Sequence, residues 1–124
     1  MVVGSTIVDV RVRGPRAGVM LKAVVDTGFF GDLITTPDKV GALGIDFRYE
    51  RPRRLPDGKL VKVKYGGGEI EVLDSVTYGD IEVWSDLKLP PGVDALLGVT
   101  ALGKMGFRVN PRTGELERVE LYLL

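Results

Sequence analysis

The sequence has 124 residues, with 17 Lys+Arg balanced by 17 Asp+Glu, 44% hydrophobic residues, and neither Cys nor His. This length predicts a single domain over residues 1–124, large enough to fold around its own core without disulfides or metals. The absence of Cys and His excludes disulfide frameworks, thiol proteases, Ser-His-Asp triads and His-ligated metal centres. We therefore expect no metal and no cofactor, and any acid–base chemistry must use carboxylates, Lys or Tyr.

Charge and hydropathy argue against two classes of partner. A net charge of zero provides no overall attraction to phosphate backbones or anionic membranes. No stretch approaches the ~18 apolar residues of a membrane span, and Met1–Val10 has no basic segment ahead of an apolar run. The sequence predicts a cytoplasmic protein that binds neither nucleic acid nor membrane.

The first elements in chain order are two strands and a short helix. Residues 8–13 alternate between valine and charged residues, which predicts a strand with one solvated face. Val19–Val25 is more continuously apolar, which predicts a strand buried on both faces that runs directly into Asp26. A helix of about two turns is predicted from Thr36, which can cap it, to Gly44, which can end it.

The middle of the chain returns to β-structure. Apolar residues alternate over Ile45–Tyr49 up to a turn signal at Leu55–Lys59, and Leu60–Tyr65 predicts the return strand. The glycine run Gly66–Gly68 is expected to interrupt the sheet as a bulge or wide turn.

A further hairpin and an apolar segment are expected next. Glu69–Val76 and Ile81–Leu87 are predicted to pair across a turn at Gly79-Asp80. The turn signal Pro90–Gly92 then separates this hairpin from the apolar segment Ala95–Gly98.

The C-terminal part predicts a short helix over Thr100–Gly106, a strand over Phe107–Val109, a turn at Asn110-Pro111, and a last strand over Glu115–Leu124. This terminal strand is apolar on both faces, which is hazardous if it stays exposed. Pairing with a second chain would cover it; a central position in the sheet of a monomer is the alternative.

Asp26 is unusual among the acidic residues of the chain. It follows the apolar pair Val24-Val25 and precedes Thr27-Gly28, which supply a hydroxyl and a glycine suited to tight turning. A strand-end aspartate in an ordinary turn is the simpler interpretation.

The segment Val24–Gly28, followed later by Ala95–Gly98, resembles the single-lobe aspartic proteases of the retropepsin-like group, including their small prokaryotic relatives. The resemblance extends from about Val19 to Asn110 and implies an all-β closed barrel, one lobe per chain, with one or two short helices. It also implies a flap hairpin, which the stretch Arg54–Val72 would form.

The resemblance implies the roles of individual residues. Asp26 would be catalytic, Thr27 would brace the opposite loop, and Gly28 would permit close backbone approach. The flap turn Leu55-Pro56-Asp57-Gly58 would contact the substrate. Many members have Ala or Ser after the glycine, whereas this chain has Phe29-Phe30, which could line a substrate pocket or pack beneath the loop.

The chemistry of such a site requires two carboxylates, because one accepts a proton from water while the other donates to the peptide carbonyl oxygen. The chain has only one Asp-Thr-Gly and no Asp-Ser-Gly, so the second carboxylate must be Asp26 of another copy. The expected protein is a homodimeric aspartic endopeptidase, joined through the terminal strands and the Asp26 loop and acting on peptides or proteins. A non-catalytic dimeric peptide-binding module on the same fold is the alternative.

Two other groups of residues have competing interpretations. Arg48, Arg51, Arg53 and Arg54 surround Tyr49 and could contact RNA, as in an RNA-associated barrel, but Pro52 and the balanced charge favour a strand edge or the base of the flap. Asp94 precedes Ala95 and is expected to cap or solvate that strand rather than to act beside Asp26.

Overall fold

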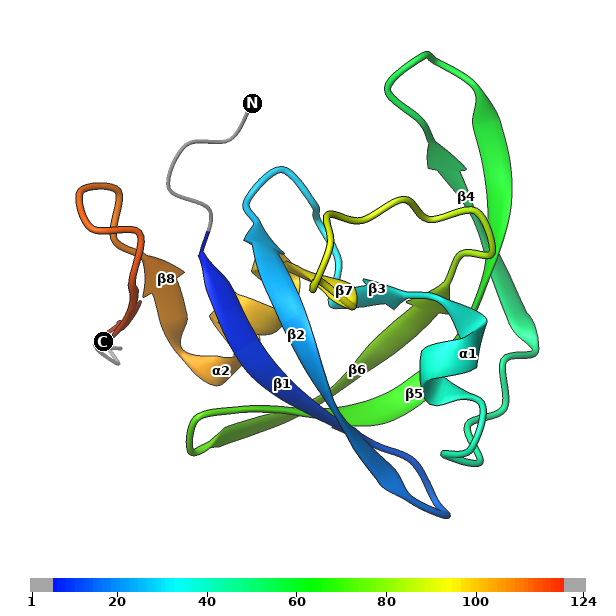
Figure 1. The fold of residues 1–124 in the computed structure, drawn as a ribbon, viewed down its shortest axis with the longest axis horizontal. Helices are drawn as coiled ribbons and strands as arrows, with labels where there is room; N and C mark the ends of the chain where they lie inside the picture. The colour runs from blue at the N-terminus through cyan, green and yellow to red at the C-terminus, as the bar shows by residue number, and fades with distance from the viewer. Residues whose placement is uncertain (1–5, 120–124) are drawn as a thin grey trace, which may run out of the picture.

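The computed structural model describes residues 6–119, and 50% of the chain is in strands that form a closed six-stranded barrel with two short helices (Figure 1). This confirms the predicted all-β barrel. Neither helix of the described residues is long and apolar enough to cross a membrane. The elements are β1 (Ile7–Arg13), β2 (Gly18–Asp26), β3 (Leu33–Thr35), α1 (Pro37–Val40), β4 (Tyr49–Arg54), β5 (Leu60–Val72), β6 (Ser75–Val83), β7 (Ala95–Gly98), α2 (Val99–Met105), β8 (Phe107–Val109) and β9 (Leu116–Arg118).

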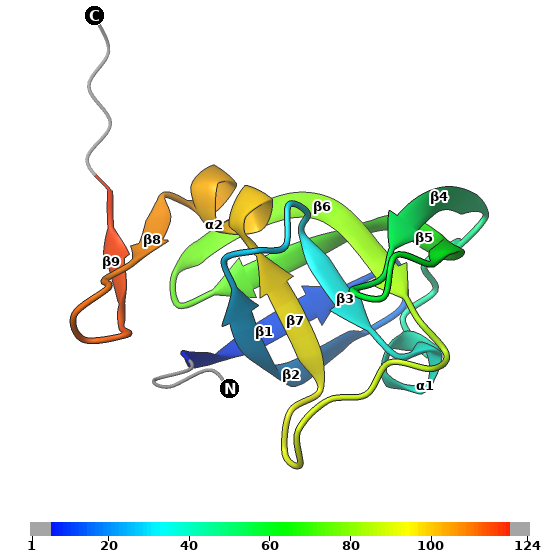
Figure 2. The same cartoon turned by 90° about the horizontal axis from the view of Figure 1, so that it is seen from above.

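The barrel is one sheet that closes on itself. Its strands follow the order β1-β2-β7-β3-β6-β5, and β5 pairs back with β1 through residues 69–71. Closure gives each of the six ring strands a neighbour on both sides, which limits the unpaired edge that could invite aggregation. Outside the ring, β4 pairs with β5 and extends away from the barrel as a hairpin, while β8 and β9 form a separate ribbon on the other side (Figure 2).

Side chains that point into the barrel form the core, and α2 closes it with Ala101, Leu102 and Met105. Side chains along β2 alternate between the core and the outer face of the barrel. Leu21, Ala23 and Val25 are buried, whereas Met20 and Lys22 are exposed. The prediction that this strand is buried on both faces was therefore wrong for the single chain. The other barrel strands contribute the buried residues Val10, Val12, Leu33, Ile70, Val72, Ile81, Ala95 and Leu97.

The first helix is shorter than predicted. It forms one turn, Pro37–Val40, and the Thr36 side chain makes no capping hydrogen bond to it. The segment that was expected to begin a strand at Ile45 is irregular, and β4 begins only at Tyr49. Ile45 and Phe47 instead pack against the core as parts of a loop.

The glycine run does not interrupt the sheet. β5 continues through Gly66–Gly68 in regular register with β6. The glycines leave space for groups from other parts of the fold. A Cβ on Gly67 would lie 2.5 Å from the Tyr78 hydroxyl oxygen, and one on Gly68 would lie 3.1 Å from the Arg13 carbonyl oxygen. The predicted bulge was wrong for this reason.

The hairpin turn between β5 and β6 lies at Leu73-Asp74, and Gly79-Asp80 lies within β6. Leu73 adopts a φ of 54°, a left-handed conformation that leucine rarely takes. A sequence pattern favours glycine or asparagine at such a position, so the turn was predicted at Gly79-Asp80 instead.

The C-terminal elements follow the prediction as far as the structure describes them. α2 ends at Gly106, whose φ is 79° and whose N–H donates to the Gly103 and Leu102 carbonyl oxygens, and β8 follows at once. β9 covers only Leu116–Arg118 and pairs with β8. The rest of the expected terminal strand, residues 120–124, lies outside the described residues, so its pairing with a second chain stays a prediction.

Candidate active site

Asp26 is the last residue of β2 and lies opposite Gly98 in the parallel pairing of β2 with β7. The two strands therefore deliver the Asp26 turn and the start of α2 side by side. The Asp26 side chain is half-buried, and its Oδ1 accepts a hydrogen bond of 2.9 Å from the Gly28 N–H. The N–H of Phe29 closes the turn on the Asp26 carbonyl oxygen at 3.1 Å, which fixes the orientation of the carboxylate.

The loop after Asp26 packs directly on the β7–α2 junction. Gly98 N–H donates to the Asp32 carbonyl oxygen at 2.9 Å, and Val99 N–H donates to the Phe29 carbonyl oxygen at 3.0 Å. A Cβ at Gly98 would lie 2.7 Å from Cδ2 of Phe29 and even closer to the Gly31 carbonyl oxygen. Glycine is thus required at position 98 for the two segments to meet.

The two phenylalanines after Gly28 have different environments. Phe29 is 8% exposed and packs beneath the loop, whereas Phe30 is 77% exposed. Both residues also line a groove beside Asp26. Packing beneath the loop and lining a pocket, which were predicted as alternatives, therefore occur together in this pair.

A groove of about 1440 Å³ connects Asp26 with the β4–β5 hairpin. Of the residues that the resemblance implicated, Asp26, Gly28, Phe29, Phe30, Leu55 and Pro56 line it. Thr27 is exposed outside this lining. Asp57 and Gly58 shape the hairpin turn instead: Asp57 Oδ1 accepts from the Lys59 N–H at 2.9 Å, and Gly58 has a φ of 88°. The opposite wall is formed by residues 83–88, which follow β6.

The base of the hairpin is held by a buried carboxylate that the sequence analysis missed. Glu82 on β6 is fully buried, and its Oε1 accepts 3.0 Å and 3.3 Å hydrogen bonds from Arg53 Nε and Trp84 Nε1. Its Oε2 pairs with Arg53 Nη2 and, at 3.4 Å, with Arg51 Nη1. In the sequence, a glutamate between Ile81 and Val83 has the pattern of a solvated strand residue. The one available signal was the excess of arginine in Tyr49–Arg54, which becomes β4, two strands away from Glu82 in the sheet.

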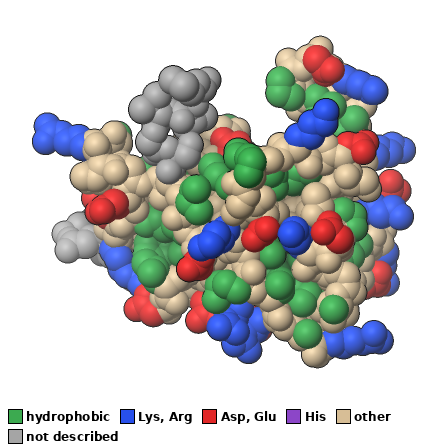
Figure 3. Space-filling view, viewed as in Figure 1, with side chains coloured by type: hydrophobic (Ala, Val, Ile, Leu, Met, Phe, Trp, Pro, Cys, Tyr) green, Lys and Arg blue, Asp and Glu red, His purple; other side chains and the backbone are tan. Residues whose placement is uncertain are grey.

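Two arginines of β4 pair with carboxylates of the chain, whereas Arg54 contacts only a carbonyl oxygen. Arg51 also pairs with Asp80 at 2.6 Å and lies 3.8 Å over the Tyr65 ring centroid. Arg54 donates to the Gly58 carbonyl oxygen in its own hairpin. Acidic and basic side chains are intermixed on the face in Figure 3. Arg51 and Arg53 are thus engaged by carboxylates of their own chain at the base of the β4–β5 hairpin.

Asp32 fixes the loop that follows Asp26 through contacts of its buried carboxylate. Its side chain is 5% exposed, Oδ2 accepts from the Asp80 N–H at 2.8 Å, and Lys104 Nζ lies 3.0 Å from Oδ1. Gly79 makes room for this carboxylate, because a Cβ there would lie 2.7 Å from Asp32 Oδ2. The ion pair connects the Asp26 loop to α2.

Asp94 lies at the opposite end of the β2–β7 pairing from Asp26. Its Oδ2 accepts from the Lys22 N–H at 2.9 Å, and Lys39 lies 3.3 Å from its Oδ1. The hydrogen bond from Lys22, together with Lys39, lowers the pKa of Asp94 below its usual value. This aspartate caps the strand, as expected, and takes no part in the Asp26 site.

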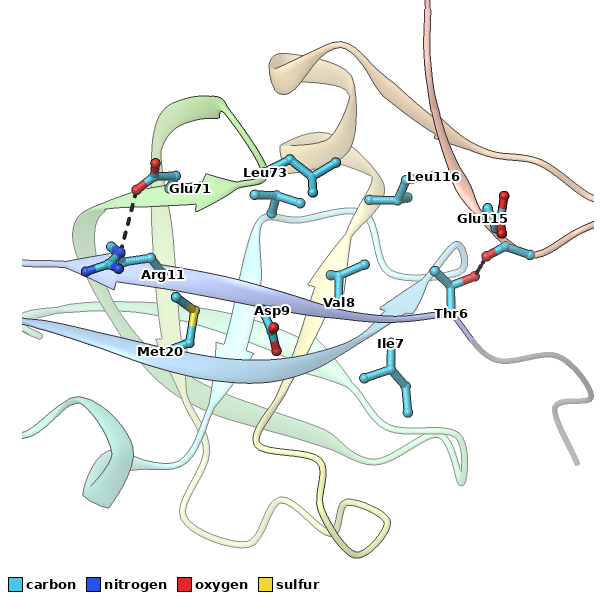
Figure 4. Close-up of a pocket in the computed structure, with 12 residues that line it drawn as sticks. Thr6, Ile7, Val8, Asp9, Arg11, Met20, Glu71, Leu73, Glu115 and Leu116 are labelled. Atoms are coloured by element: carbon cyan, nitrogen blue, oxygen red, sulfur yellow. Dashed lines mark hydrogen bonds and ion pairs between the residues drawn. The ribbon is translucent and has the colours of Figure 1, made fainter.

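A second hollow of about 700 Å³ lies between β1 and the β9 ribbon (Figure 4). Its lining includes the exposed apolar residues Ile7, Met20 and Leu73, and the Thr6 hydroxyl bridges it by donating to the Gly114 carbonyl oxygen. Ile7 pairs with Val24, so this apolar surface begins at the Asp26 end of β2.

Across residues 6–119, no group of three or more carboxylates is gathered closely enough to hold a metal ion. No family model and no curated protein matches this sequence.

Proposed function

We propose that the chain is a retropepsin-like aspartic endopeptidase that works as a homodimer, with one Asp26 contributed by each copy. The observation that carries this proposal is the groove that runs from Asp26, past Phe29 and Phe30, to the tip of the β4–β5 hairpin. An extended peptide would lie in this groove beneath the hairpin. The glycine contact of the Asp26 loop with Gly98 supports the assignment, because it holds the carboxylate at the open end of two parallel strands.

In the proposed dimer, the two Asp26 carboxyl groups share one proton, because two adjacent carboxylates resist simultaneous ionisation. The ionised group takes a proton from water while the water oxygen bonds to the peptide carbon, and the protonated group gives its proton to the carbonyl oxygen. Proton transfer to the amide nitrogen then allows the C–N bond to break, and a carboxylic acid and an amine are released.

Two features support a dimer axis near Asp26. Thr27 is exposed in the single chain, where it could reach the loop of a second copy. The apolar surface around Ile7, which is 53% exposed, begins at the same end of β2. Burying such a surface against its counterpart would stabilise a symmetric pair.

Replacement of the carboxyl group tests the mechanism. Asp26→Asn is expected to abolish peptide cleavage while the circular dichroism spectrum and the sedimentation coefficient stay unchanged. Asp86→Asn is the matched control, because Asp86 lines the same groove and has no proposed chemical role; it should retain cleavage. Undiminished cleavage of a peptide library by Asp26→Asn overturns the proposal.

Dilution tests whether two chains build the site. Peptidase activity that is blocked by a statine-type inhibitor should fall faster than linearly as the protein is diluted, because the dimer dissociates by mass action. Strict proportionality at every concentration, in a protein that sediments as a monomer, contradicts the shared site. Peptide binding without cleavage at any pH would favour the dimeric binding module.

A further inference from the structure

The seam of the barrel between β1 and β5 is closed over only part of its length. β1 pairs with β5 through residues 11–13, which lie opposite residues 69–71. The same register would place Leu73 opposite Asp9, but the chain reverses at Leu73-Asp74 and returns as β6. Within residues 6–119, the first part of β1 therefore has a strand neighbour on the β2 side alone.

Backbone groups of Ile7 and Asp9 point out of this open edge. Lys22, opposite Asp9 on β2, directs its own groups away from β1: its N–H donates to Asp94 Oδ2 at 2.9 Å, and its carbonyl oxygen accepts from the Asp94 N–H at 2.7 Å. Opposite residues of an antiparallel pair exchange either two hydrogen bonds or none. Asp9 therefore directs its N–H and carbonyl oxygen to the open side, as does Ile7 two residues earlier. Among residues 6–119, these four groups have no hydrogen-bond partner.

The open edge lies in the hollow of about 700 Å³ between β1 and the β9 ribbon, a volume typical of ligand pockets (Figure 4). Thr6 closes one end of the hollow by donating to the Gly114 carbonyl oxygen. Val8, Leu73 and Leu116 line the hollow on the side of β1 that faces the core. The hollow thus combines unpaired backbone groups with an apolar wall.

Leu73 lies over this hollow in a strained conformation. Its φ of 54° is in the left-handed region, where glycine would fit without strain. The side chain is 73% exposed, so packing within the described chain does little to offset the strain. A strained residue of this kind indicates a role in binding.

We propose that the open edge binds an extended peptide of a partner protein, which adds an antiparallel strand to β1 in the place that β5 leaves empty. Peptide residues opposite Ile7 and Asp9 exchange backbone hydrogen bonds with them. The peptide residue between these two lies opposite Val8 and points an apolar side chain at the apolar wall. This binding site does not depend on the proposed function.

The charge of the lining indicates a basic residue near the C-terminal end of the peptide. Two of the three acidic residues of the lining pair with basic side chains, whereas Glu115 makes no ion pair with a described residue. Glu115 follows Gly114 at the Thr6 end of the hollow, where an antiparallel peptide has its C-terminus. Residues 120–124 of a second copy match this charge less well, because they contain Glu120 and no Lys or Arg.

N-methylated peptides test the addition of a strand. The probe is Val-Ser-Val-Ser-Val-Lys, labelled with fluorescein, and its anisotropy is measured with the Asp26→Asn chain so that cleavage cannot consume it. The two serines lie opposite Asp9 and Ile7 in the proposed register. N-methylation of both serines should weaken binding about tenfold, because two hydrogen bonds are lost. N-methylation of the second and third valines, whose N–H groups point away from β1, should weaken it less than about threefold. Equal losses in the two peptides overturn the strand model.

Substitutions in the chain locate the probe. Asp9→Pro removes an edge N–H that the barrel does not use and should abolish binding. Leu73→Asn removes the apolar side chain but tolerates a positive φ, so binding should weaken about fivefold without a loss of thermal stability. Leu60→Asn, at an exposed leucine outside the hollow, is the matched control and should bind the probe normally. Unchanged binding by Leu73→Asn, or by a folded Asp9→Pro chain, overturns the site.

Charge reversal tests the direction of the peptide. The native chain should prefer the probe to the same peptide ending in Glu, and Glu115→Lys should reverse that preference. A preference for Lys that survives Glu115→Lys overturns the antiparallel assignment.

Sedimentation separates a partner peptide from a second copy. The Asp9→Pro chain should sediment as the native chain does. A smaller sedimentation coefficient for Asp9→Pro would show that a second copy occupies the edge and would overturn the partner peptide. Probe binding with no peptidase activity in the native chain supports this site and counts against the protease alone, whereas peptidase activity without probe binding overturns this site alone.

Discussion

The guanidinium of Arg53 lies over the ring of Phe29, 5.1 Å from its centroid. Phe29 directly follows the Asp26-Thr27-Gly28 turn, and Arg53 belongs to β4 of the hairpin. The same guanidinium is paired with the buried carboxylate of Glu82. The hairpin base and the Asp26 loop are thus held in register by one side chain, and the position of the hairpin over the groove depends on the Glu82 ion cluster.

Glu82→Gln should lower the free energy of unfolding by about 3 kcal/mol, because it leaves the partly buried Arg53 without its counter-charge and removes one of the two carboxylates that pair with Arg51. Hydrogen exchange should accelerate most in β4, since this strand pairs with β5 alone. Chemical denaturation and exchange mass spectrometry measure the two effects. Glu69→Gln, at an exposed site on β5, should stay within about 0.5 kcal/mol of the native chain. Equal effects of the two variants would contradict the importance of the cluster.

Gly98→Ala should destabilise the chain by about 2 kcal/mol, because the new methyl group would overlap the Gly31 carbonyl oxygen and the Phe29 ring. Gly103→Ala provides a matched control on α2, where an added Cβ meets nothing within 4 Å. It should raise stability by up to about 1 kcal/mol through helix propensity. Thermal unfolding of both variants makes the comparison; a neutral Gly98→Ala would show that the two segments do not pack tightly.

Lys104→Met should cost about 3 kcal/mol, since it leaves the buried carboxylate of Asp32 without its cation. Adding Asp32→Asn should recover part of the loss by removing the stranded charge. Lys22→Met removes a lysine from an exposed pair, with both side chains 62% exposed, and should cost less than about 1 kcal/mol. Denaturant titrations of these variants measure the costs, and an Asp32→Asn addition that worsens stability would argue against a stranded charge.

Asp94 should stabilise the fold in a pH-dependent manner. Its pKa in the folded chain is lowered from 3.8, chiefly by the hydrogen bond from the Lys22 N–H. A carboxyl group with a depressed folded pKa contributes stability above its unfolded pKa and loses that contribution as the pH falls through the folded pKa. Asp94→Ala should therefore cost about 1 kcal/mol at neutral pH, and the cost should shrink below about pH 4.

Urea unfolding at a series of pH values measures this dependence. Asp86→Ala serves as the control, because Asp86 is exposed and has no ion pair with a described residue, so its small effect should not vary in the same way. If the loss of stability caused by Asp94→Ala grew as the pH fell, the predicted pH dependence would be contradicted.

Patterns of adjacent residues predicted several elements correctly. The alternation over residues 8–13 matches β1, the glycine at 106 ends α2, and the turn signal at Leu55–Lys59 forms the hairpin tip. Each of these depends on local chemistry: side-chain alternation, a left-handed glycine, or a proline and glycine in a turn. Such features need no knowledge of distant residues.

The errors occurred where distant residues decided the outcome. Gly66–Gly68 remain in a strand because Tyr78, Arg13 and the 45–46 segment approach them from elsewhere in the fold. The turn at Leu73 is imposed by the pairing of β5 with β6 against the local preference of leucine. Neither the close approach of distant groups nor the pairing of two strands can be recognised from a few neighbouring residues.

The amino-acid order by itself determined an all-β chain with one aspartate at the end of an apolar strand, because periodicity and turn residues act over a few neighbouring positions. Only the tertiary structure decided that Glu82 is a buried counter-charge and that Phe29 is covered while Phe30 is exposed. Burial and charge pairing depend on which strands become neighbours, and barrel closure sets this through contacts between residues far apart in the chain.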